Sequence, residues 1–133
     1  MAFLSTSRIT SLLKITAVMN IVAGSAALLM PELNVSLLFG SHIVLQGHLM
    51  RFHLMLWSFV LAMGLGYWLA AQSPEDQTGI LLTGGIGKLI FVGLCIETLW
   101  SGYGTALLLG PIIFDTVIGA ALLIYVAPRL RAA

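Results

Sequence analysis

The segment ILLTGGIGKLIFVGLCIETLW, residues 80–100, decides the fold class. A helix needs about 20 predominantly apolar residues to cross the hydrocarbon of a bilayer, and the only charged residues in this segment are Lys88 and Glu97. Two similar runs precede it and one follows, at about 9–30, 43–71 and 106–127. The sequence therefore predicts an all-α, integral membrane four-helix bundle with both termini on the same side, in which residues 1–133 form a single membrane domain.

The composition excludes most other classes. The chain has 133 residues, of which 8% are charged and 59% hydrophobic, whereas about 25% of a typical soluble domain is charged. A net charge of +1 without a basic stripe argues against a nucleic-acid partner. One cysteine excludes a disulfide framework. The expected partners are the lipid bilayer and either a larger membrane protein or further copies of the chain.

The connections and prolines refine these boundaries. Segment 32–42 is too apolar for a free loop, so it is either a short helix in the membrane interface or an early start of the second span. The second span begins with a polar third, and its hydrocarbon part is expected to start near Leu54. Pro31 should end the first span and Pro128 the fourth, and Pro111 should kink the fourth.

The basic residues predict the orientation. Lys and Arg favour the cytoplasmic side of a membrane, and four of them flank the first and last spans: Arg8, Lys14, Arg129 and Arg131. Both termini are therefore expected in the cytoplasm. The small residues at 23–27 also fit a signal-peptide cleavage region. The apolar run before them is long for such a peptide, which favours an uncleaved span.

Three polar residues are expected in one layer near the middle of the bilayer. At 1.5 Å rise per residue, Asn20, Lys88 and Asp115 lie about 12–16 Å from the cytoplasmic ends of their spans. An ion pair between Lys88 and Asp115 would cancel both charges, with Asn20 as a further hydrogen-bonding group. Ionisable residues at this depth often belong to functional sites. The layer is thus either a proton relay or polar substrate site, or a buried pair that fixes helix register, and the structural interpretation is the commoner one.

A second cluster is expected toward the outer face. Glu97 is nine residues beyond Lys88, and Arg51 should enter the membrane at nearly the same level, so the two are predicted to pair. His48 and His53 lie close to Arg51 in sequence. The histidine spacings do not place two metal ligands on one helix face, so no metal site is predicted.

Small and aromatic residues complete the expected packing. Ala62, Gly66 and Ala70 repeat at the four-residue spacing that lets membrane helices approach closely. Gly84, Gly85 and Gly87 surround Lys88, which would make room for a ligand or for a neighbouring helix. Aromatic residues near the span ends are expected to anchor the interface: Trp57, Tyr67, Trp68, Trp100, Tyr103 and Tyr125.

One family shares this arrangement of residues. An Arg early in the second span (Arg51), then GLGYWLAAQSP (64–74), then a Gly-rich stretch ending in Gly87-Lys88, then Asp115 resembles the small bacterial DoxX-like four-helix membrane proteins. The resemblance covers nearly the whole chain and implies a place in the bacterial cytoplasmic membrane. Some members are linked to quinone-coupled redox chemistry. The family supplies no fixed catalytic set, so the resemblance assigns none here.

Three functions remain open from the sequence. No catalytic triad, P-loop or dinucleotide motif is present, which favours a non-catalytic accessory or assembly subunit of a larger membrane complex over an enzyme. The second is a redox component that binds a quinone or lipid through either polar cluster; no cofactor is predicted on other grounds. The third is a small proton-coupled transporter.

Overall fold

The computed structural model describes residues 5–130, and these residues are helical apart from short connections. Four long helices have the length and apolar character to cross a membrane, the last of them together with the 3-10 turn that precedes it. The described residues contain no strand, so the all-helical fold with four potential spans is as predicted. The elements are α1 Thr6–Leu29, α2 Pro31–Phe39, α3 Gly47–Ala70, η1 Pro74–Asp76, α4 Thr78–Trp100, η2 Ala106–Leu108 and α5 Leu109–Leu130.

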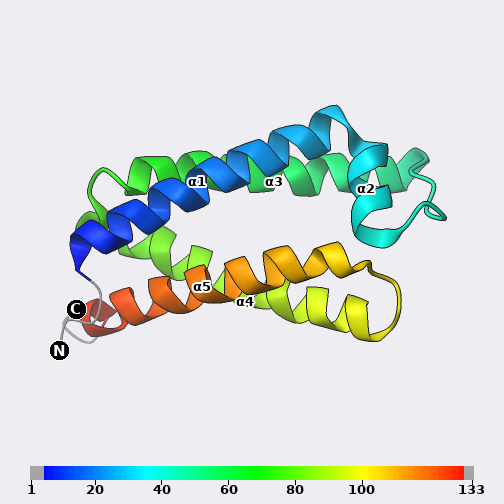
Figure 1. Cartoon of the computed structure of the whole chain (residues 1–133). Coiled ribbons are helices and arrows are strands. Elements are labelled where there is room, and N and C mark those ends of the chain that lie inside the picture. Colours follow the sequence, from blue (N-terminus) through cyan, green and yellow to red (C-terminus); the bar gives the residue numbers. More distant parts are fainter. Residues whose placement is uncertain (1–4, 131–133) are drawn as a thin grey trace.

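The long helices form two pairs (Figure 1). α1 packs mainly along α3, and α4 packs mainly along α5. We call the end where α1 begins and α5 ends the terminal end, and the opposite end the α2 end. The two pairs lie together at the terminal end and separate toward the α2 end. This arrangement determines which of the predicted contacts can form.

The shared core lies at the terminal end. Its buried side chains come from all four long helices and from Ala71. Around it, the Thr6 hydroxyl donates a 2.7 Å hydrogen bond to the Glu75 carboxylate, and the Arg129 guanidinium stacks 3.8 Å from the centre of the Tyr125 ring. The core consists of Ile9, Leu13, Ala17, Tyr67, Ala70, Ala71, Leu81, Ile118, Leu122, Tyr125 and Val126.

The α2 end is closed by the short helix α2. Pro31 ends α1 and opens α2, and Gly40, with a φ of 90°, separates α2 from α3. An early start of the second span is therefore wrong. Thr105 in the α4–α5 connection donates its backbone N–H to the Leu38 carbonyl at 2.8 Å and its hydroxyl to the Leu37 carbonyl at 2.5 Å. α2 thus joins the two helix pairs at this end.

The two prolines of the fourth span lie at opposite ends of α5. Pro111 lies in the first turn, directly after η2, where a backbone N–H has no partner within the helix, and the kink expected there stays a prediction. Pro128 lies inside α5, which continues to Leu130, so the expected end of the span at Pro128 is wrong. The Arg129 side chain donates a 2.7 Å hydrogen bond to the Tyr125 carbonyl, and it thereby adds a donor to the last turn.

Within the chain itself, the small-residue prediction for α3 holds only at Ala70. α1 and α3 approach at Gly24, where an added Cβ would lie 3.0 Å from Leu61, and at Gly64, where it would lie 2.9 Å from Ile21. Ala70 is buried as predicted, but Ala62 is exposed, and a Cβ added at Gly66 would meet nothing within 4 Å. The outward position of Ala62 and Gly66 leaves them without a packing role in the described chain.

Candidate functional site

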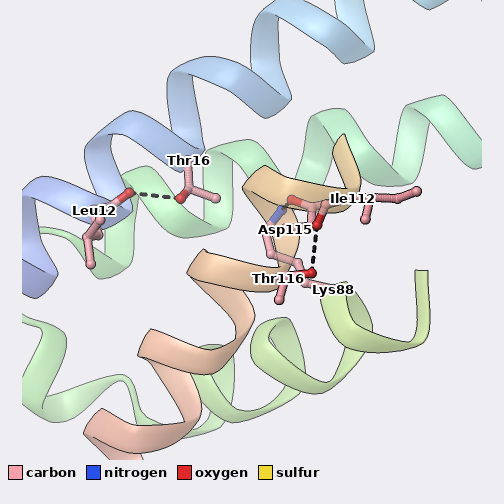
Figure 2. Close-up of polar contacts among 6 residues, drawn as sticks. All are labelled: Leu12, Thr16, Lys88, Ile112, Asp115 and Thr116. Carbon is pink, nitrogen blue, oxygen red and sulfur yellow. Dashed lines mark hydrogen bonds and ion pairs between the residues drawn. The ribbon is translucent and has the colours of Figure 1, made fainter. Parts of the chain in front are cut away.

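Lys88 on α4 and Asp115 on α5 form an ion pair between their Nζ and Oδ1 atoms (Figure 2). The two residues are 7% and 8% exposed, and theirs is the single ion pair among residues 5–130. The pairing expected from helix rise is therefore present. Because each charge is neutralised by direct contact, burial does not leave an isolated ion in an apolar interior.

A close crossing of α4 and α5 positions the pair. A Cβ added at Gly85 would lie 3.2 Å from the Gly119 carbonyl, and one added at Gly119 would lie 3.1 Å from the Gly85 carbonyl. Lys88 is three residues after Gly85, and Asp115 is four residues before Gly119, so each charge lies one helical turn from the crossing. The two glycines bring the backbones close enough for the side chains to meet.

Two aromatic rings cover the lysine. The Lys88 Nζ lies 5.9 Å from the centre of the Tyr67 ring and 5.6 Å from that of Phe114, within the range of cation–π attraction. Tyr67 is 2% exposed, and a Cβ at Gly84 would occupy the position of its ring. The glycine run before Lys88 therefore makes room for Tyr67 and for α5.

The sequence interpretation missed both rings and assigned Tyr67 to the membrane interface. A signal for its burial was present. Gly64, Tyr67 and Ala70 follow each other at three-residue spacing, which places them on one helix face, and all three are buried.

Asn20 does not join the pair. Its side chain is half-buried and makes no hydrogen bond within residues 5–130. α1 packs mainly on α3, so its midpoint faces a different helix from the one that carries Asp115. The buried polar residue of α1 is instead Thr16, whose hydroxyl donates a 2.8 Å hydrogen bond to the Leu12 carbonyl of the same helix (Figure 2).

The predicted outer cluster is not assembled. Arg51 and Glu97 are both exposed, and the described residues contain no ion pair between them. One carboxylate oxygen of Glu97 accepts a 3.1 Å hydrogen bond from the Ser101 hydroxyl. His48 is exposed. Equal depth did not produce contact because the two helix pairs separate toward this end.

His53 has a structural partner instead. It is buried, and its Nε2 lies 3.2 Å from the Ala27 carbonyl of α1. In a continuous helix this carbonyl would accept from residue 31, but Pro31 has no N–H. His53 therefore supplies the donor that the end of α1 lacks, which fixes the proton on Nε2.

Two hollows of the described surface lie away from the ion pair. They measure about 300 and 260 Å³, the first lined by Val18, Ile21, Val22, Leu65 and Trp68 and the second by residues 29–33. Neither touches Lys88 or Asp115. The described residues also contain no group of three potential metal ligands among His, Cys, Asp and Glu. The pair can thus fix the register of α4 against α5, as buried polar contacts do in membrane bundles.

Comparison of the chain with protein-family models, with curated proteins and with solved structures gave no match. The DoxX-like resemblance stays a prediction.

Proposed function

We propose that this chain is a small integral membrane protein that acts as a non-catalytic accessory or assembly subunit of a larger membrane complex. The observation that carries the proposal is the position of Lys88 and Asp115, which neutralise each other inside the α4–α5 pair. A buried ionisable group in a membrane protein is a candidate for function by default. Here both groups are engaged in holding two helices together.

The chain has little mass outside its helices with which to act on a soluble substrate. Its longest connections are α2 with the following turn and the short η1 and η2 segments. Large apolar side chains are exposed along all four long helices, as lipid or protein contact in a membrane requires. The proposal also places the chain in a bacterial cytoplasmic membrane with both of its termini in the cytoplasm. The basic residues Arg8, Lys14 and Arg129 at the terminal end support this orientation.

The two alternatives have less support. A quinone or lipid headgroup bound at Lys88 would need an opening from the bilayer, but Tyr67 and Phe114 cover the ammonium group. A proton carrier would need a polar path through the midplane, and Asn20 does not extend the pair. A DoxX-like redox component therefore remains the second candidate, without a contact that favours it.

The test is extraction of the tagged chain from native membranes with its lipids retained, followed by native electrophoresis, mass spectrometry and quinone analysis. We expect a discrete complex that contains a different protein in fixed ratio. The variant Lys88→Met/Asp115→Leu, which replaces the pair by apolar residues, should still assemble. A stoichiometric quinone that co-purifies with the wild-type chain and is lost from this variant would overturn the proposal in favour of the redox component.

A further inference from the structure

The outward faces of α3 and α4 each carry a stripe of residues spaced alternately by four and three positions. This spacing keeps side chains on one face of a helix, as in the seam of a coiled coil. Every member of both stripes is exposed. The α3 stripe consists of Arg51, Met55, Ser58, Ala62, Leu65 and Leu69, and the α4 stripe consists of Thr83, Gly87, Ile90, Leu94 and Glu97.

The glycines on this side of the molecule have no role in the packing of the chain itself. A Cβ added at Gly87, or at Gly66 beside the α3 stripe, would meet nothing within 4 Å. Gly84, Gly85 and Gly119 differ, because an added Cβ there would collide with Tyr67 or with the facing helix. Glycine weakens a helix relative to alanine, so its use at Gly66 and Gly87 is unexplained by the fold. Small residues at such positions let another membrane helix approach closely.

Each stripe also begins or ends with a charge at the same level. Arg51 lies in the first turns of α3 and Glu97 in the last turn of α4, so both are at the α2 end. Within residues 5–130, Arg51 has no ionic partner and Glu97 accepts only from Ser101. The two charges have opposite sign, and each lies near the edge of a membrane-spanning segment, where pairing offsets the loss of hydration.

We propose that the α3 stripe is the docking surface for the α4 stripe of a second copy of this chain, with Arg51 of one copy facing Glu97 of the other. The copies share one orientation in the membrane, so the two stripes run antiparallel. From Arg51 to Ala62 the rise is about 16 Å, and from Glu97 to Gly87 it is about 15 Å. The register that joins the charges therefore also places Ala62 opposite Gly87.

A second copy is the occupant that fits these observations. Both complementary surfaces, with matched spacing, matched small residues and opposite charges, belong to the same chain. Lipid would explain the apolar members but neither the open glycines nor the two charges at one level. The inference is independent of the accessory role, because a self-associated chain can serve in a larger complex or act without one.

The test measures the self-association of the purified full chain in phosphatidylcholine vesicles. Copies with a donor or an acceptor dye on an N-terminal tag are diluted with lipid, and energy transfer is measured as a function of chain density. We expect saturable transfer for the wild-type chain. Arg51→Glu and Glu97→Arg should each weaken association about tenfold, since like charges then face each other. The double variant Arg51→Glu/Glu97→Arg should restore it.

A steric variant tests the same surface without a change in charge. Gly87→Leu adds a side chain where the chain itself has open space, so the bundle should fold while association falls about tenfold. Gly110→Leu is the control, because Gly110 is equally open but lies on α5, which carries neither stripe; it should associate like the wild type.

Three results would overturn the proposal. The first is energy transfer between wild-type copies that is no higher than random proximity gives. The second is association that the single charge reversals leave unchanged, and the third is a double reversal that fails to restore association. The first would leave the accessory role intact, because a different membrane protein would be absent from these vesicles.

Discussion

The two faces of α4 carry similar residues and differ in what those residues contact. The inward face holds Gly84, Gly85 and Lys88, each of which meets a neighbouring helix of the same chain. The outward face holds Gly87 and Glu97, which meet no other helix among the described residues. A charge or a glycine in a membrane helix is thus no sign by itself of packing within the bundle. The position of the residue around the helix axis decides whether it packs within the bundle.

Removal of one charge from the inward face of α4 should destabilise the protein most. Lys88→Met leaves the Asp115 carboxylate without its partner in a buried position, and we expect the free energy of unfolding to fall by about 3 kcal/mol. Unfolding by sodium dodecyl sulfate in mixed micelles measures the change. Lys88→Met/Asp115→Leu should recover most of the loss. Wild-type stability and assembly for Lys88→Met would contradict the structural role of the pair.

Inward and outward glycines should also respond differently to a single methyl group. Gly84→Ala forces its Cβ against the Tyr67 ring, and overpacking of this kind lowers stability by about 1–3 kcal/mol. Gly93→Ala, in open space on the same helix, should be neutral or stabilising by up to about 1 kcal/mol. The same unfolding assay compares them. Equal changes in the free energy of unfolding from both substitutions would mean that Tyr67 moves aside without loss of stability.

The same comparison holds on α3, where His53 faces inward and Arg51 outward. His53→Phe removes the donor to the Ala27 carbonyl, which Pro31 cannot replace. An unsatisfied buried carbonyl lowers stability by about 1–2 kcal/mol. His53→Gln keeps an amide donor and should retain more of the stability than His53→Phe. If both variants unfold alike, the hydrogen bond does not contribute and the ring acts by packing alone.

The sequence predicted the features that depend on distance along a helix, which are the span positions and the depth of each charge. Hydropathy located the four spans to within a few residues at most ends, and a rise of 1.5 Å per residue placed Lys88 level with Asp115. The same arithmetic placed Arg51 level with Glu97, yet these two do not meet. Depth says nothing about rotation around the axis or about which helices pair.

Two of the remaining errors have the same origin. Asn20 was assigned to the midplane layer by depth, but α1 packs mainly on α3. Tyr67 was assigned to the interface by its place near a span end, although its spacing from Gly64 and Ala70 puts it on the buried face. The error at Pro128 has a different cause, because α5 runs on to Leu130, past the boundary near 127 that was drawn from hydropathy. The spacing of the small residues shows which face of α3 is buried, and it would have placed Tyr67 on that face.

The smallest effect on the fold should come from the outward charge. Glu97→Gln keeps an oxygen that can accept from Ser101, and the side chain is exposed, so the free energy of unfolding of the monomer should change by less than about 0.5 kcal/mol. The measurement is made in micelles at a chain density too low for association. A loss above 1 kcal/mol would show that Glu97 stabilises the monomer itself, and the two faces of α4 would then be equivalent. A negligible loss, beside the large one at Lys88, would assign the inward charge to the fold and leave the outward charge free for contact with another chain.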